Sequence, residues 1–167
     1  FIVQTTAEQF LRFSPIFLKD SHIKYVELGI ESFNDHILIR LRKPHNTNLI
    51  SKAMEYAQYL GIKIIPNIMV GLAGVDKQGK QWNETLETYT NTIQFLQKFK
   101  GVISHVNIYT LALYQGTQSF KELSINADTD NNENSLKRTW LKDRSLQEGE
   151  WFYNTVLEYG IRILNKE

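Results

Sequence analysis

The chain has 167 residues, of which 42% are hydrophobic and 22% charged, a composition that suits one globular domain with a sizeable core. Nineteen basic residues against eighteen acidic ones give a net charge of +1, and no run of Lys or Arg is dense enough to indicate nucleic acid as a partner. No apolar stretch reaches the roughly 18 to 20 residues of a membrane helix, and the N-terminus does not look like a signal peptide, so we expect a cytoplasmic protein.

The first predicted elements are a strand and a helix. Residues 1–6 read FIVQTT, which looks like a strand entered in the middle of a domain, and because no Met begins the sequence we expect a fragment. A helix is predicted from Ala7 to about Phe13, with Thr6 as its N-cap and Pro15 ending or bending it.

The second predicted strand, residues 25–30, alternates between two kinds of side chain. One face carries Glu27, Gly29 and Glu31, and the other carries Val26, Leu28 and Ile30. In a barrel the apolar set would face the surrounding helices, so the two carboxylates are expected inside.

A helix over residues 47–60 is predicted next, because apolar side chains recur there at helical spacing. Asn46, Thr47 or Asn48 can cap its start, and Gly61 can end it. Residues 62–70 then form a nearly continuous apolar run, which is typical of a strand buried on both faces of a parallel sheet.

The rest of the chain predicts two more helices and one more strand. Asn83 can cap a helix running to about Lys100, a strand is expected over 102–113, and a helix over about 145–164. The polar stretch 126–135 lacks the glycine and the glutamate of a calcium-binding loop, so we interpret it as solvated.

Strands and helices therefore alternate along most of the chain, which predicts an α/β fold with parallel strands and outer helices. About four βα units would form a partial TIM-like barrel. We expect residues 1–117 to be this partial barrel, 118–144 to be a polar loop region, and 145–167 to include a C-terminal helix that packs on the same domain.

Ligands of such folds bind beyond the C-terminal ends of the strands, which here are residues 31–32, 71–74 and 113–117. A carboxylate at one strand end can accept hydrogen bonds from a ribose diol, and glycines at the next let a flat ring approach the backbone. Main-chain groups of the third can read an adenine edge. These residue types favour a nucleoside-like ligand.

Residues 1–117 resemble the radical S-adenosylmethionine (radical SAM) enzymes, as the third to sixth βα units of their partial barrel. ELGIESFN resembles the fourth strand of that family, in which Glu31 would hold the ribose of S-adenosylmethionine, and LRKPH resembles a following L-x-R-x-H segment, in which Lys43 would contact the methionine carboxylate. Lysine keeps the positive charge but lacks the two-pronged geometry of arginine.

PNIMVGLAG resembles the family's G-x-I-x-G-x-x-E motif, with Asn67 in place of the first glycine and Gly74 in place of the glutamate, while IYTLALYQGT resembles the sixth strand. Met69 would lie against the adenine. Together the resemblance implies ten cofactor-binding residues: Gly29, Glu31, Ser32, Lys43, Asn67, Met69, Gly71, Tyr109, Thr110 and Leu111. No catalytic residue is identified.

The resemblance implies that a [4Fe–4S] cluster cleaves S-adenosylmethionine reductively, giving a 5′-deoxyadenosyl radical that abstracts hydrogen from a substrate, as in an oxidoreductase or transferase. Three cysteines in C-x-x-x-C-x-x-C normally hold that cluster, and this sequence has none. We therefore expect the cluster only in a longer parent protein, with its ligands on an upstream segment, and an inactive fragment here.

Another class of function is also open, namely a non-catalytic half-barrel that binds a nucleotide or a protein partner, for which uncovered edge strands would offer a surface. Glu27 could line the barrel or pair with a base, since a buried carboxylate needs a partner. The four histidines come without a cysteine, a serine or a metal-ligand spacing, so they indicate no catalytic site. The sequence does not identify the substrate.

Overall fold

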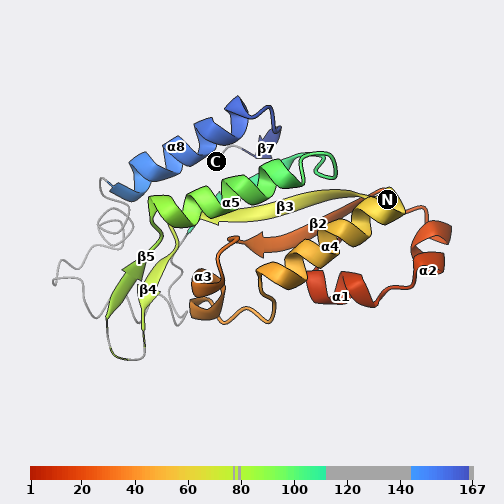
Figure 1. The fold of residues 1–167 in the computed structure, drawn as a ribbon, viewed down its shortest axis with the longest axis horizontal. Coiled ribbons are helices and arrows are strands. Elements are labelled where there is room, and N and C mark those ends of the chain that lie inside the picture. Colours follow the sequence, from red (N-terminus) through yellow and green to blue (C-terminus); the bar gives the residue numbers. More distant parts are fainter. Residues whose placement is uncertain (77, 79, 112–143, 166–167) are drawn as a thin grey trace.

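The computed structural model of the protein describes residues 1–76, 78, 80–111 and 144–165. At its centre lies a five-stranded parallel sheet in the order β1-β2-β3-β6-β7 (Figure 1). The strands are β1 (Ile2–Thr5), β2 (Tyr25–Glu31), β3 (Lys63–Val70), β6 (Val106–Thr110) and β7 (Ile163–Asn165). The predicted α/β fold with parallel strands is thus confirmed.

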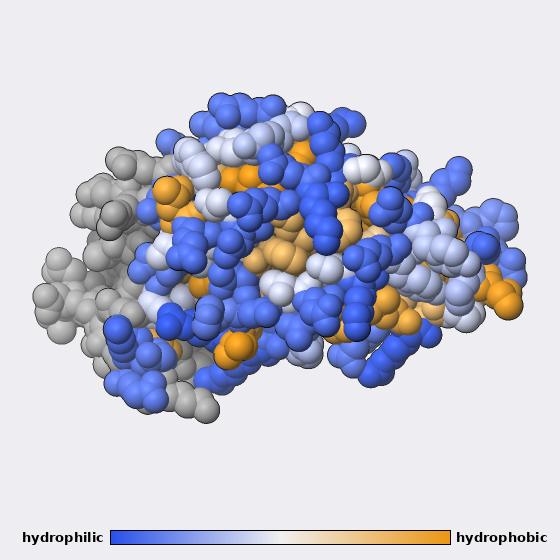
Figure 2. Space-filling view, in the orientation of Figure 1, coloured by the Kyte–Doolittle hydropathy of each residue, from blue (hydrophilic) through white to orange (hydrophobic). Residues whose placement is uncertain are grey.

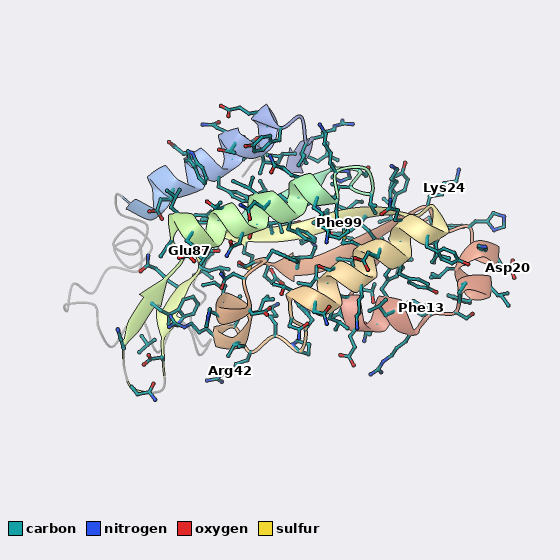
Figure 3. The ribbon with its side chains drawn as sticks, in the orientation of Figure 1. Phe13, Asp20, Lys24, Arg42, Glu87 and Phe99 are labelled. Carbon is teal, nitrogen blue, oxygen red and sulfur yellow. The ribbon has the colours of Figure 1, made fainter. Side chains whose placement is uncertain are left out.

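Helices cover one face of this sheet, which we call the outer face. They are α1 (Ala7–Arg12), α2 (Pro15–Asp20), α3 (Asp35–Arg40), α4 (Thr47–Leu60), α5 (Leu86–Lys98) and α8 (Arg144–Glu158). The main core contains side chains of α1, α2, α3, α4, α5 and α8 together with alternate residues of the strands. Phe99, which follows α5 and is labelled in Figure 3, is one of these buried side chains.

The alternation predicted for β2 is confirmed. Val26, Leu28 and Ile30 are buried in the core beneath the helices, whereas Glu27 and Glu31 lie on the opposite face. We call this second face the inner face. Figure 2 shows the helix-covered side as mostly hydrophilic, with hydrophobic side chains visible between the helices.

Local signals fixed the start and end of two predicted helices. Thr6 caps α1 by accepting a hydrogen bond from Gln9 N, and Asn46 caps α4 by accepting one from Leu49 N. Gly61 ends α4 in the left-handed conformation at φ 71°, which glycine adopts without steric cost.

The structure adds one helix to those predicted and corrects the start of another. Pro15 does more than end a helix: it begins α2, because Ser14 caps that helix and proline suits its first position. The helix predicted over 83–100 is α5, which begins after Thr85 because Thr85 and Thr88 form a reciprocal capping box.

The predicted last helix, 145–164, is also too long. Helix α8 ends at Glu158, and Gly160, at φ 65°, donates its N–H to Leu157 O and turns the chain. Residues 163–165 then form β7, a fifth parallel strand beside β6. Strand β6 itself is shorter than the predicted 102–113 and spans Val106–Thr110.

The sequence did not predict the hairpin between β3 and α5. Its antiparallel strands are β4 (Ala73–Val75) and β5 (Gln81–Asn83), and Figure 1 shows it extending away from the sheet at the end where β3 terminates. The predicted polar loop, 118–144, lies almost entirely outside the described residues.

Candidate functional site at the strand ends

The C-terminal ends of β2, β3 and β6 lie next to one another. Gly29 is in register with Asn67, and Asn67 with Asn107, while Met69 pairs with Tyr109 on the next strand. The predicted cofactor-binding residues of the three strands therefore share one end of the sheet, where ligands of such folds bind.

Glu31 has an unusual backbone conformation at the end of β2. Its φ is 66°, and Ser32 N donates to Ile30 O at 2.8 Å, so Glu31 is the central residue of a tight three-residue turn. The register with β3 also shifts between Gly29 and Glu31. Such a conformation is costly for a residue other than glycine, and strained residues cluster at binding and catalytic sites.

The Glu31 carboxylate forms an ion pair with Lys43. Lys43 Nζ lies 2.7 Å from Glu31 Oε1, and the exposed fractions of the two side chains are 33% and 15%. The sequence predicted separate contacts for these residues, with a ribose and with a carboxylate, but the structure joins them directly. A ligand that uses both must either share this pair or open it.

A pocket of about 360 Å³ adjoins the ion pair. It is lined by Gln4, Thr5, Thr6, Gln9, Gly29, Glu31, Lys43, Pro44 and His45. Of the predicted cofactor-binding residues, only Gly29, Glu31 and Lys43 line it. Its size lies within the usual range for small-molecule sites, and β1 and the start of α1 supply polar groups that sequence reasoning missed.

His45 is a buried residue of this pocket, with 5% of its surface exposed. Neither ring nitrogen has a hydrogen-bond partner within normal geometry among the described residues. Burial lowers the pKa of His45, and the nearby Lys43 also lowers it, although the backbone of Ile30 and the charge of Glu31 oppose the shift. The imidazole is therefore neutral at pH 7, and it can donate one hydrogen bond and accept another.

The turn after β3 is held by two side chains from beyond the hairpin. Glu84 accepts a hydrogen bond from Leu72 N at 3.1 Å, and the Tyr89 hydroxyl accepts one from Gly71 N at 2.9 Å. The resemblance predicted a glutamate at position 74, where the sequence has Gly74. The carboxyl group beside this turn comes from Glu84 instead.

Burial dominates the electrostatics of this turn. Only 3% of Glu84 is exposed, and desolvation raises its pKa to about 8, although the hydrogen bond from Leu72 N opposes the shift. Burial, and then the nearby Glu84, raise the pKa of Tyr89 above its usual range. Ser32, a predicted site residue, is buried with no hydrogen bond of normal geometry among the described residues, yet its hydroxyl lies close enough to lower the pKa of Glu84.

Gly74 has a packing role. A Cβ atom at this position would lie 2.8 Å from the indole ring of Trp82, across the hairpin. The other neighbours of Trp82 include Arg40, whose guanidinium carbon is 5.2 Å from the ring centroid. The close contact between the two hairpin strands thus explains why glycine stands where the motif predicts glutamate.

Met69 belongs to a small apolar cluster at this end of the sheet. The buried members are Ile37, Leu72 and Trp82, and Leu41, Met69 and Leu111 pack against them. Leu111 N donates to Val70 O at 3.0 Å, so that group is already used within the protein. Thr110, another predicted site residue, is exposed at the end of β6.

Glu27, Asn67 and Asn107 form a ladder of hydrogen-bonded side chains across the inner face, one row below the strand ends. We call it the polar ladder. Asn67 Nδ2 donates to Glu27 Oε1 at 2.9 Å, and Asn107 Nδ2 donates to Asn67 Oδ1 at 3.0 Å and to Glu27 Oε1 at 3.4 Å. The partner that the Glu27 carboxylate needs is therefore supplied by two amides from β3 and β6. Asn67, predicted as a cofactor-binding residue, is engaged in this ladder.

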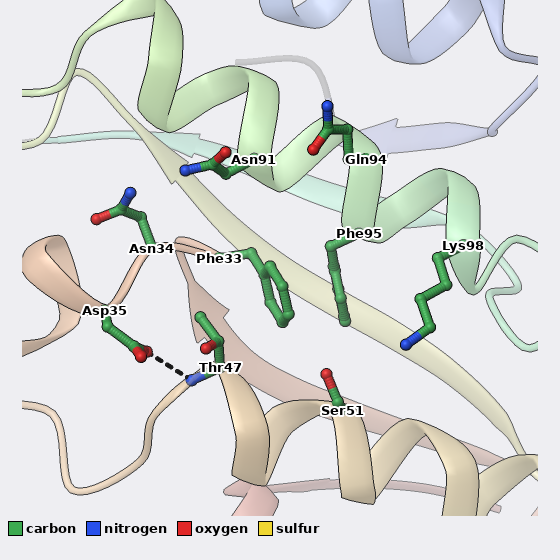
Figure 4. A pocket seen from close by; sticks show the side chains of 9 residues that line it. All are labelled: Phe33, Asn34, Asp35, Thr47, Ser51, Asn91, Gln94, Phe95 and Lys98. Atoms are coloured by element: carbon green, nitrogen blue, oxygen red, sulfur yellow. Dashed lines mark hydrogen bonds between the residues drawn. The ribbon is translucent and has the colours of Figure 1, made fainter.

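A second pocket, of about 460 Å³, lies on the outer face between α4 and α5 (Figure 4). Its lining includes the stacked rings of Phe33 and Phe95, whose centroids are 4.1 Å apart, and Asp35 accepts a hydrogen bond from Thr47 N at its rim. The predicted site residues all lie elsewhere.

The described part of the chain contains neither a metal-binding group of side chains nor a helix that could cross a membrane. No group of three or more His, Asp or Glu side chains there could hold a metal ion, and the whole sequence contains no cysteine. Among the described residues, no helix is both long and apolar enough to cross a membrane.

Comparison with known proteins gives one curated relative and several similar structures. No protein-family profile matches the chain. An uncharacterized protein of Methanocaldococcus jannaschii is 26% identical over 102 residues, which are 61% of this chain and 28% of that protein. The chain therefore spans well under two thirds of this relative.

The solved structures that match are also longer. Coproporphyrinogen III oxidase (HemN) of Escherichia coli, described as a radical SAM enzyme, matches with a TM-score of 0.64 at 11% identity, over 95% of this chain and 32% of HemN. Elp3 of Methanocaldococcus infernus matches with a TM-score of 0.57 at 16% identity, over 96% of this chain and 42% of that one.

A third structure is TsrM of Kitasatospora setae, a radical S-adenosylmethionine methyltransferase with cobalamin and a [4Fe–4S] cluster bound. It matches with a TM-score of 0.57 at 14% identity, over 74% of this chain and 23% of TsrM. At these identities the likeness concerns the fold. The chain has an α/β fold that corresponds to part of the TIM-like barrel found in radical SAM enzymes.

Proposed function

We propose that this chain is the C-terminal part of a radical SAM catalytic barrel and that it binds S-adenosylmethionine at the ends of β2, β3 and β6. The observation that carries the proposal is Glu31, held in a strained turn beside a pocket of about 360 Å³ and paired with Lys43 at 2.7 Å. The similarity of the fold to HemN and TsrM supports it.

In this proposal the two members of the ion pair contact different parts of the cofactor. Glu31 accepts hydrogen bonds from the ribose hydroxyls, and Lys43 binds the methionine carboxylate as a point charge. Gly29 adjoins the Glu31 carboxylate, since a Cβ atom at Gly29 would lie in van der Waals contact with Glu31 Oε1, at 3.5 Å. The existing ion pair keeps both side chains oriented until the ligand enters.

The adenine would lie at the ends of β3 and β6. Met69, beside Leu111, offers an apolar contact, and the turn at Gly71 is fixed by Tyr89 and Glu84. A rigid turn without a side chain at Gly71 lets a flat ring approach the backbone closely. Backbone groups of residues 109–111 other than Leu111 N would then read the edge of the base.

The proposed cluster does not fit the residues of this chain. Thiolates hold [4Fe–4S] clusters, and this sequence supplies none, so its ligands would lie on an upstream segment of the parent protein. When bound, the cluster would supply the electron that cleaves S-adenosylmethionine. A parent sequence without C-x-x-x-C-x-x-C within roughly 60 to 110 residues upstream of Phe1 would contradict the enzymatic proposal.

Calorimetric titration of the chain with S-adenosylmethionine tests the binding site directly. We expect saturable binding that Glu31→Ala weakens by about tenfold or more, because a hydrogen bond to a charged group is lost. Glu55→Ala, an exposed glutamate of α4, is the matched control and should bind normally. Equal binding by both variants would contradict the proposal.

An alternative, a non-catalytic half-barrel that binds a nucleotide or a protein partner, draws support from exposed apolar side chains on the edge strand β1 and on helix α2. Ile2 on β1 and Ile16 and Phe17 on α2 are exposed by 63%, 73% and 52%. Concentration-dependent association without S-adenosylmethionine binding would favour a protein partner. Binding of adenosine alone, unaffected by Lys43→Ala, would favour a nucleotide module.

A further inference from the structure

The polar ladder of Glu27, Asn67 and Asn107 has a fixed polarity. A carboxylate only accepts hydrogen bonds, so the amide nitrogens of both asparagines must point toward Glu27, as the distances of 2.9 and 3.4 Å record. The amide oxygen of Asn67 accepts a hydrogen bond from Asn107 Nδ2. Among the described residues, Glu27 Oε2 and Asn107 Oδ1 remain as acceptors for another molecule, beside one N–H donor of Asn67.

The charge of Glu27 has no cationic partner in the described part of the protein. The ion pairs there join Arg12 with Glu8 and Lys43 with Glu31. His105 lies near Glu27, but burial, and then the nearby Arg162, lower its pKa and outweigh the charge of Glu27, which raises it, so the imidazole is neutral at pH 7. A half-buried carboxylate held only by two amides is an arrangement that a cation would complete.

The ladder is also well placed and rigid. Its three residues come from adjacent strands of the parallel sheet, β2, β3 and β6, one row below the strand ends where ligands bind. Each amide is held by at least one hydrogen bond of 3.0 Å or shorter, which pre-organises the remaining acceptors.

We propose that Glu27, Asn67 and Asn107 form a binding site for an ammonium or guanidinium group of the substrate. The description of this group as part of a substrate rests on the proposed function, whereas the binding of a cation does not. The site is distinct from the pocket at Glu31 and Lys43, which none of the three residues lines.

Side-chain amide NMR of the 167-residue chain provides the test, with agmatine as the probe because it carries both a guanidinium and an ammonium group. We expect the amide signals of Asn67 and Asn107 to shift saturably with agmatine. Neither sodium chloride of equal ionic strength nor 1-butanol should shift them, because neither offers an organic cation with directed donors. The absence of a saturable shift would overturn the proposal.

Substitutions locate the binding. Glu27→Gln should weaken the apparent affinity for agmatine by about tenfold or more, since it removes the charge and keeps the shape. Glu55→Gln is the matched control on the exposed side of α4 and should change nothing. Unchanged agmatine affinity in Glu27→Gln would overturn the proposal. Because Glu27→Gln could impair folding, Glu27→Asp serves as a second variant, expected to retain part of the affinity.

The same samples separate this proposal from the proposed function. Glu27→Gln should bind S-adenosylmethionine as the unaltered chain does, and Glu31→Ala should bind agmatine normally. Agmatine binding without S-adenosylmethionine binding would contradict only the proposed function. Loss of agmatine binding in Glu31→Ala together with its retention in Glu27→Gln would place the cation at the strand ends and overturn the ladder site.

Discussion

The two faces of the parallel sheet use the same strands for different purposes. On the outer face, Leu28 and Ile64 are fully buried beneath the helices. On the inner face, other residues of the same two strands, Glu27 and Asn67, form a hydrogen bond across the sheet. Alternate residues of each strand therefore belong either to the core beneath the helices or to the polar inner face, with a period of two along the strand.

The largest effect is expected from the outer face. Ile64→Ala should lower the free energy of unfolding by about 2 to 5 kcal/mol, because it removes a buried side chain and leaves a cavity. Urea denaturation measures the change. Ile39→Ala, at an exposed position of α3, should change stability by only about 0.5 kcal/mol. Equal effects of the two substitutions would break the contrast between the faces.

A smaller loss is expected at the hairpin beside the strand ends. Gly74→Ala should destabilise the protein by about 1 to 3 kcal/mol, because the new methyl group overlaps the indole of Trp82. The fluorescence of the protein during denaturation follows this change. Gly101→Ala is the matched control, since a Cβ atom there meets nothing within 4 Å. A neutral Gly74→Ala would mean that the two hairpin strands can separate.

The buried carboxyl of Glu84 predicts a pH dependence. Its pKa rises from 4.5 to about 8 on folding, so between these values the folded protein binds more protons than the unfolded chain. Its contribution to stability is fully present below pH 4.5 and is lost as pH rises to about 8, by at most about 1.4 kcal/mol per unit.

Denaturation of Glu84→Gln across this range isolates that contribution. The substitution should remove most of the fall in stability between pH 5 and 8, because a glutamine cannot ionise. Glu87→Gln, at an exposed position in the first turn of α5 (labelled in Figure 3), should keep the pH dependence of the unaltered protein. An unchanged profile in Glu84→Gln would show that the carboxyl is not held in its neutral form.

The smallest expected effect separates strain from binding at Glu31. Glu31→Gly should be more stable than Glu31→Ala by about 1 kcal/mol, because only glycine adopts a φ of 66° without steric cost. Both variants lose the ion pair with Lys43, so their difference reports the backbone alone. Denaturation measures it, and both variants should bind S-adenosylmethionine about tenfold or more weakly than the unaltered chain. Equal stability of the two variants would show that the backbone of this turn relaxes when the side chain is changed.

Much of the fold was predictable because its signals are local. The caps Thr6 and Asn46, and Gly61 at the end of α4, lie within a few residues of the helices that they begin or end. The alternation in β2 identified the outer and inner faces. The hairpin escaped prediction because strands of three residues are too short to show a period.

The candidate site was predictable only in part. Glu31 and Lys43 were identified as separate contacts, but their ion pair depends on how the chain folds back after α3. Glu84 was missed because a hairpin separates it from the motif at Gly71, and the capping sequence around Thr85 gave no sign of a buried carboxyl. The role of these residues in binding S-adenosylmethionine stays a prediction.

By itself, the sequence determined most of the longer strands and helices and which side chains of β2 share a face, because both follow from spacing along the chain. Only the tertiary structure decided that Glu27 meets Asn67 and Asn107, since those contacts join positions 40 and 80 residues apart. They arise from the pairing register of three parallel strands, which local patterns leave open.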